Sequence, residues 1–194
     1  MVDPILFGIA VVAILATPGP TNTLLATAGA ANGLRRSLPL IPAEVTAYLV
    51  AIMTIGFLIG PLVATVPMLA AALRLAVAVY LAVLALRLWR RGGADIVRSR
   101  LVRPRDVFVT TLLNPKAVIF ATGVIPLDHP DSAAYVAAFC ILLVIISLSW
   151  IGVGVVIGRG MLSAGGSAIV PRVGAAALWA FAVVLTVTAF KLTS

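Results

Sequence analysis

The chain has 194 residues, of which 62% are hydrophobic and only 10% charged, and its mean hydropathy is +1.20. Soluble domains have about 45–50% apolar and about 25% charged residues, so this composition excludes an ordinary soluble domain and indicates an integral membrane protein. The net charge of +8 does not indicate nucleic-acid binding, because the basic residues lie mainly between apolar stretches and no aromatic residues interleave with them to form a stacking surface.

Six apolar stretches are long enough to cross a membrane as helices, because about 30 Å of hydrocarbon requires about 20 residues. They cover roughly residues 4–31, 38–60, 67–89, 106–126, 133–157 and 170–190. The first basic residue is Arg35, so the first stretch lacks the basic start of a cleaved signal peptide, and we expect it to be retained. The sequence therefore predicts an all-α membrane protein with six transmembrane helices in a single domain, residues 1–194.

The arginines between the spans predict the orientation of the bundle, because Lys and Arg collect in cytoplasmic loops. The first, third and fifth loops carry two, six and two arginines, whereas the second and fourth loops carry none. This pattern predicts both termini on the outer face of a cytoplasmic membrane. The third loop, near residues 90–105, would also attract anionic membrane lipids.

The two halves of the chain share a layout that indicates an internal repeat. Pro18 and Pro115 are 97 positions apart, half of the chain length, and the span boundaries repeat at about the same interval. A unit of three helices crosses the membrane an odd number of times, so its second copy is upside down. The sequence thus predicts two inverted three-helix repeats, residues 1–97 and 98–194, a layout that many secondary transporters have.

Each predicted repeat begins with a broken helix, at Pro18-Gly19-Pro20 and at Asn114-Pro115-Lys116. Proline lacks a backbone N–H and clashes with the preceding turn, so the breaks leave polar backbone groups that lipid does not satisfy. The half-helix that starts near Thr21 would present its positive end to a substrate carboxylate, with Asn22 adding a polar side chain. The alternative is a packing kink that binds no ligand.

Two charged side chains are predicted inside the spans. Lys116 lies about ten residues into the fourth span, and Glu44, about six residues into the second, is the only acidic residue well inside a span. A charge at the bilayer centre costs about 2.5–3.5 kcal/mol on insertion scales, which makes both residues candidates for function. The alternatives are a structural ion pair or, for Lys116, a side chain that reaches toward the interface.

Three segments resemble a known family. ATPGPTNTLL in the first span, the following GLRRS, and LLNPKAVIFATGVIP in the fourth are similar to the lysine exporter/homoserine exporter (LysE/RhtB) family of amino-acid exporters. The resemblance covers essentially the whole chain in length, number of spans and order of motifs. It implies a small carrier of the bacterial inner membrane that exports an amino acid or related metabolite and is energised by a proton gradient or the membrane potential.

The substrate-binding residues that we predict lie at the two breaks, namely Pro18, Gly19, Pro20, Thr21, Asn22, Asn114, Pro115 and Lys116. One segment differs from the family pattern, because the second span opens with SLPLIPAEVTAYL where relatives usually have glycines. Glu44 belongs to this segment. An acidic group there would bind a substrate ammonium or carry a proton.

The sequence disfavours two other functional classes. Export of metal ions by a distantly related carrier is disfavoured, because His129 is the only histidine, Cys140 the only cysteine, and the spans contain no cluster of carboxylates. An enzyme is disfavoured because Ser147 and Ser149 lie in an apolar span that lacks histidine and aspartate to act as a base. We therefore expect neither catalysis nor a resident metal or cofactor.

The remaining alternative is a membrane assembly subunit that does not transport. Its support comes from glycines four residues apart, Gly56 with Gly60 and Gly154 with Gly158. Such pairs allow two helices to approach closely, either inside one bundle or at the face of a homodimer.

Overall fold

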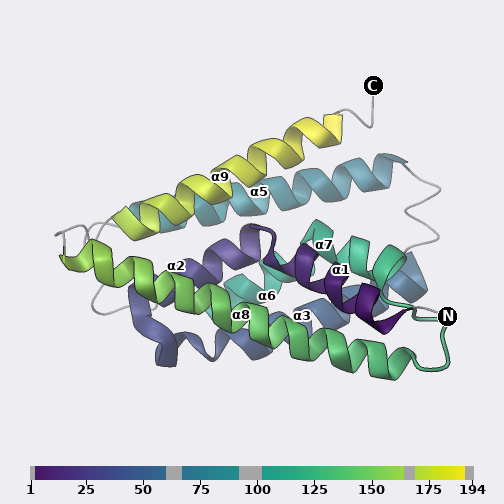
Figure 1. The fold of residues 1–194 in the computed structure, drawn as a ribbon. Helices are drawn as coiled ribbons and strands as arrows, with labels where there is room; N and C mark the ends of the chain where they lie inside the picture. Colours follow the sequence, from purple (N-terminus) through teal and green to yellow (C-terminus); the bar gives the residue numbers. More distant parts are fainter. Residues whose placement is uncertain (1–2, 60–66, 92–101, 164–168, 191–194) are drawn as a thin grey trace.

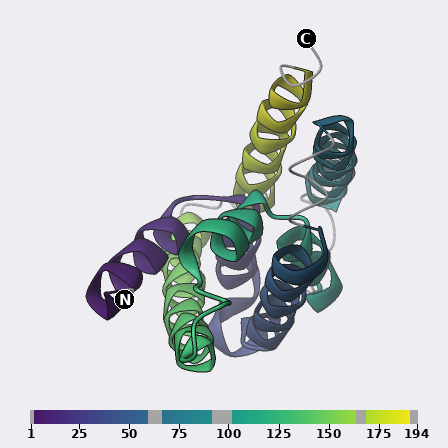
Figure 2. The same ribbon diagram turned by 90° about the vertical axis from the view of Figure 1, so that its right-hand side faces the viewer.

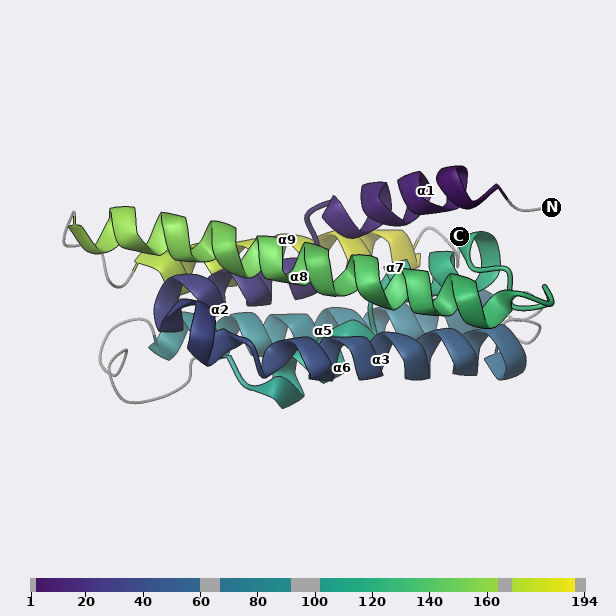
Figure 3. The same cartoon turned by 60° about the horizontal axis from the view of Figure 1, so that its bottom comes forward.

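The computed structural model describes residues 3–59, 67–91, 102–163 and 169–190 (Figure 1). Within these ranges every regular element is a helix, as the composition predicts. The helix axes are roughly aligned with one another, and α1 lies at the edge of the bundle (Figure 3).

The first predicted break divides the first span into two helices, α1 (Pro4–Ala16) and α2 (Pro20–Ser37), whose axes are bent by 63°. Asp3 caps α1, because its carboxylate accepts hydrogen bonds from the backbone N–H groups of Ile5 (2.7 Å) and Leu6 (3.3 Å). Prolines break the helix between the two segments, and Pro20 occupies the first position of α2, where its missing N–H costs nothing. The break is therefore confirmed.

α2 extends further than predicted. The sequence predicts a loop at residues 31–37, whereas the structure has helix on both sides of Gly33, whose own backbone is not helical. Gly33 has φ = 76°, in the left-handed region that glycine adopts without strain. The turn predicted in this segment is therefore present at Gly33, but helix extends further into the segment than the sequence predicts.

The second predicted break has the same form. α6 (Pro104–Leu112) is followed by α7 (Pro115–Ile119) and the π-helix η2 (Phe120–Val124), with a bend of 48°. Asn114 begins α7 as its N-cap, and its side-chain oxygen accepts a hydrogen bond from the backbone N–H of Lys116 at 3.1 Å. Both helix breaks are therefore present at the predicted residues.

The other helices follow each bent pair in the same order. α3 (Leu40–Thr54) continues into the π-helix η1 (Ile55–Ile59) and is followed by α5 (Pro67–Arg91), whereas α8 (Ser132–Ser163) is followed by α9 (Ile169–Phe190).

Length and composition identify two single helices that are able to cross a membrane, Leu40–Phe57 and Ser132–Gly160. The two bent pairs pass the same test when each is taken as one span, so the described residues contain two to four candidate spans. Shorter apolar segments lie at Ala78–Arg87 in α5 and Arg172–Val184 in α9. The structure thus supports a helical membrane protein, and the six-span inverted repeat stays a prediction.

The long helix α8 runs beside both halves of the first bent pair, α1 near its start and α2 near its end (Figure 1). α5 and α9 pack side by side (Figure 2). Glycines allow the close approach of α2 and α8, because a Cβ added at Gly154 or Gly158 would overlap the backbone of Ala26 or Ala30. This glycine pair therefore packs inside the chain, whereas Gly60 lies outside the described residues.

Candidate functional site

The break after α1 exposes two backbone carbonyl oxygens, those of Leu15 and Thr17. The side-chain amide of Asn22 donates hydrogen bonds to both, at 2.8 Å and 3.0 Å. The ammonium of Lys116 donates to the same two oxygens. Two side chains therefore take the place of the backbone N–H groups that a continuous helix would supply.

The ammonium of Lys116 lies at the C-terminal end of α1, where the helix dipole favours a positive charge. It also packs against Gly19, since a Cβ added there would lie 3.3 Å from both Cε and Nζ of the lysine. The sequence predicts Lys116 as a substrate-binding residue. In this conformation the lysine holds the preceding half-helix, and its binding of a carboxylate stays a prediction.

A second group of hydrogen bonds joins the two breaks directly. The hydroxyl oxygens of Thr21 and Thr111 lie 3.1 Å apart, and the side-chain amide of Asn114 donates to Thr21 at 3.2 Å. The same amide donates to the Tyr48 hydroxyl of α3 at 3.5 Å. All four residues are buried, so this polar junction links α2, α6, α7 and α3 inside the bundle.

Aromatic rings hold Tyr48 from its other side. Its ring packs edge to face against Phe120 and Phe139, with centroids 6.0 Å and 5.7 Å away. Phe120 and Phe139 pack against each other at 4.9 Å. This apolar cluster fixes the tyrosine and leaves its hydroxyl directed toward the polar junction.

Glu44 lies one helical turn before Tyr48 on α3 and is only 1% exposed. Its carboxyl oxygen Oε2 is 2.5 Å from the hydroxyl of Ser147 in α8, which is also 2.7 Å from the carbonyl oxygen of Leu143. Lys116 acts on Glu44 electrostatically, but in the described part of the chain the two form no salt bridge.

The structure brings residues of both predicted breaks together, and Glu44 lies one helical turn from Tyr48, which accepts a hydrogen bond from Asn114 at the second break. Gly19, Pro20, Thr21, Asn22 and Asn114 are buried, Lys116 is half-buried, and Pro18 and Pro115 are exposed.

Three partners of these residues, Tyr48, Thr111 and Ser147, are absent from the predicted site. Tyr48 follows Glu44 by four residues, a spacing that places two side chains on one helix face. Thr111 lies three residues before Asn114, near the end of the helix that precedes the second break. Ser147 comes from a distant helix, and its pairing with Glu44 has no local signal.

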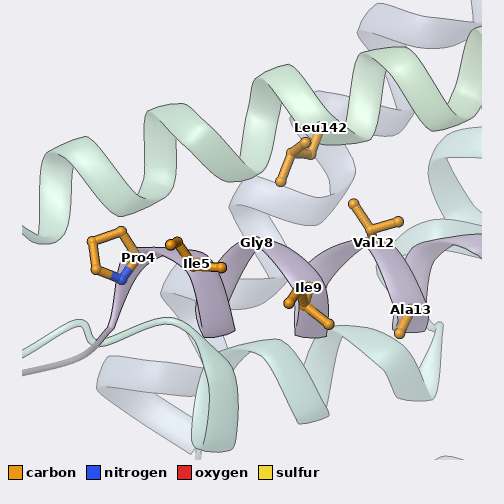
Figure 4. Close-up of a pocket in the computed structure, with 7 residues that line it drawn as sticks. All are labelled: Pro4, Ile5, Gly8, Ile9, Val12, Ala13 and Leu142. Carbon is orange, nitrogen blue, oxygen red and sulfur yellow. The ribbon is translucent and has the colours of Figure 1, made fainter.

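An apolar groove lies along α1 where that helix faces α8 (Figure 4). Its lining residues are Pro4, Ile5, Gly8, Ile9, Val12, Ala13 and Leu142. None of them belongs to the polar junction, and Ile5 and Ile9 are 72% and 61% exposed. The groove therefore offers an apolar surface and no polar recognition of a charged solute.

No three His, Cys, Asp or Glu side chains gather into a metal-binding group among the described residues. His129 lies in the turn before α8, where its Nδ1 accepts a hydrogen bond from the backbone N–H of Asp131 at 3.1 Å. The imidazole thus contributes to a local turn.

A comparison with known protein families matches residues 12–189 to the family model described as LysE type translocator. No curated protein and no solved structure matches the chain. The matched region contains both helix breaks, Glu44 and Ser147.

Proposed function

The chain belongs to the LysE family of translocators, and from this premise we propose that it exports a small amino acid or related metabolite across the bacterial inner membrane. Family membership makes the chain a transporter rather than an enzyme. The observation that carries the proposal for this chain is the meeting of two helix breaks, joined by buried hydrogen bonds between Thr21, Thr111 and Asn114.

The first break offers complementary ends to a zwitterion. α2 begins with N–H groups that lack intrahelical acceptors and carry a partial positive charge, which suits a carboxylate. α1 ends with the carbonyl oxygens of Leu15 and Thr17, which already accept hydrogen bonds from the ammonium of Lys116. A substrate carboxylate would draw Lys116 toward α2, and the substrate's own ammonium would take its place on the carbonyls.

Export also requires an energy source, which we propose to be a proton gradient or the membrane potential. Glu44 is the group in the described spans that is able to exchange a proton or hold a substrate ammonium. Its burial and its place one turn from Tyr48, which accepts a hydrogen bond from the second break, support such a role.

For the whole chain we propose six spans in two inverted repeats, with both termini on the outer face. The repeated order of a bent pair followed by two helices supports this arrangement. The exposed apolar residues of α1 would face membrane lipid. A homodimer stays a proposal, and it would need a surface other than Gly154 and Gly158, which pack against α2.

Uptake of labelled amino acids into inside-out membrane vesicles tests this function. We expect uptake of at least one zwitterionic or cationic amino acid, and competition by its unlabelled form but not by its methyl ester, because the ester lacks the carboxylate. Uptake that the ester inhibits equally would contradict carboxylate recognition. Uptake of a divalent metal ion, with no amino-acid flux, would favour the metal-exporter alternative.

A further inference from the structure

The hydroxyl oxygen of Ser147 lies between two oxygen atoms that accept hydrogen bonds. It is 2.5 Å from Oε2 of Glu44 and 2.7 Å from the carbonyl oxygen of Leu143. Both distances are in the range of O–H···O hydrogen bonds. A serine hydroxyl has only one hydrogen, so Ser147 is able to donate to one of these neighbours but not to both.

The protonation state of Glu44 decides whether both contacts are hydrogen bonds. If the carboxyl group is ionised, the three oxygens share one hydrogen, and one close pair has none between its atoms. If Glu44 is protonated, its O–H donates to Ser147, and the Ser147 hydroxyl donates to Leu143. The observed geometry therefore fits a carboxyl group that holds a proton.

The surroundings of the pair favour the same state. Glu44 and Ser147 are each 1% exposed, and burying an ionised carboxylate without full compensation is unfavourable. The titratable groups of the described residues that interact electrostatically with Glu44 are Lys116 of α7 and Tyr48 of α3. The hydrogen bonds of Lys116 go to α1 and to none of the Glu44 oxygens.

We infer that Glu44 and Ser147 together form a proton-binding site between α3 and α8. This inference deepens the proposed function, because it assigns Glu44 to the proton rather than to a substrate ammonium. In the occupied state the proton lies on the Glu44 carboxyl oxygen and is donated to Ser147. On release the proton passes to water, and the Ser147 hydroxyl turns from the Leu143 carbonyl to the carboxylate.

Ser147 is then a positioning residue, and Ser149 provides its matched control. The hydroxyl of Ser149 also donates to a carbonyl of its own helix, that of Ile145 at 2.9 Å, but Ser149 is exposed. Ser147→Ala removes the partner of Glu44, whereas Ser149→Ala removes only a bond within the helix. A difference between the two variants therefore reports on the carboxyl group.

Infrared difference spectroscopy of the purified full-length protein in lipid, titrated with acid and base, tests the site. We expect the carbonyl stretch of a protonated carboxyl group in the wild type, its loss in Glu44→Gln, and a shift to higher frequency in Ser147→Ala, because a hydrogen bond is lost. Ser149→Ala should leave the band unchanged. If Ser147→Ala does not fold, the comparison with Glu44→Gln decides alone.

Absence of a band that Glu44→Gln removes, across the pH range in which the protein stays folded, would overturn the inference. The same would follow if Ser149→Ala shifted the band as far as Ser147→Ala. Substrate flux in vesicles separates this result from the proposed function. Flux without the band contradicts the proton site alone, and the band without flux of any amino acid contradicts the proposed function alone.

Discussion

The ammonium of Lys116 donates a hydrogen bond to the carbonyl oxygen of Thr17, which lies 99 positions earlier in the chain. This bond fastens the second helix break to the end of the half-helix that precedes the first. A substrate that binds at the breaks must compete with this contact or use it. Variants that remove or displace the ammonium should therefore affect stability and transport together.

Lys116→Met should abolish transport and also lower stability. Hydrogen bonds to charged groups contribute about 1.5–3 kcal/mol, and the methionine leaves the α1 carbonyls with Asn22 as their side-chain donor. Thermal unfolding in detergent measures the stability, and vesicle uptake measures the flux. Lys116→Arg should rescue poorly, because a planar guanidinium differs from a compact ammonium. Flux at the wild-type level in Lys116→Met would contradict a role in substrate binding.

Gly19→Ala displaces the same ammonium without removing it. The new methyl group would lie 3.3 Å from Cε and Nζ of Lys116, closer than ordinary packing allows. Gly19 has an extended backbone with φ = −160°, which alanine also adopts, so the effect should come from the lysine. We expect a several-fold loss of uptake in an inserted protein. Gly8→Ala is the control, because a Cβ there meets nothing within 4 Å; equal losses in both variants would contradict the displacement.

The helix breaks were predictable because they depend on local chemistry. A proline removes a backbone donor wherever it stands, so Pro18, Pro20 and Pro115 predict a break without knowledge of the fold. The N-cap role of Asn114 is equally local, since its side chain reaches an N–H two residues ahead. Charge inside an apolar span likewise singled out Glu44 and Lys116.

The partners of these residues were not predictable, because they depend on how the helices are rotated and packed. Ser147 is 103 positions from Glu44, and only the crossing of α3 with α8 brings the two together. The direction of the Lys116 side chain has the same cause. The sequence predicts a role for its ammonium in substrate binding but not its partner in the fold, and packing places it on the end of α1.

Gly154→Ala should destabilise the bundle by about 1–3 kcal/mol, the usual effect of adding atoms to a packed interface. The added methyl group would overlap the backbone of Ala26 in α2, and backbone atoms have no room to move aside. Gly152→Ala, in the same helix, places a methyl group where nothing lies within 4 Å. Thermal unfolding of the two variants measures the difference, and equal melting temperatures would contradict close packing of α2 on α8.

A cytoplasm-dependent reporter fused to the C-terminus should be inactive, because every arginine cluster lies in an odd-numbered loop. The same reporter inserted in the third loop, at residue 93, should be active and serves as the positive control. Strong activity of the C-terminal fusion would contradict the proposed orientation. Activity of both fusions would show that the third loop and the C-terminus both lie in the cytoplasm, with an even number of spans between them.

Glu44→Gln should remove the pH dependence of export while leaving exchange of labelled for unlabelled substrate measurable. In inside-out vesicles the lumen corresponds to the outer face, so a carrier that exchanges substrate for protons should take up substrate faster when the lumen is acidic. Glutamine keeps the size and the hydrogen-bonding capacity of a protonated Glu44 but never releases a proton. The variant should therefore stay folded, with the glutamine side chain beside Ser147, and show the same uptake at every luminal pH.

Asp128→Asn, which removes an exposed carboxylate in the turn before α8, is the matched control and should respond to pH as the wild type does. Acid-stimulated uptake that persists in Glu44→Gln would place the coupling proton on another group.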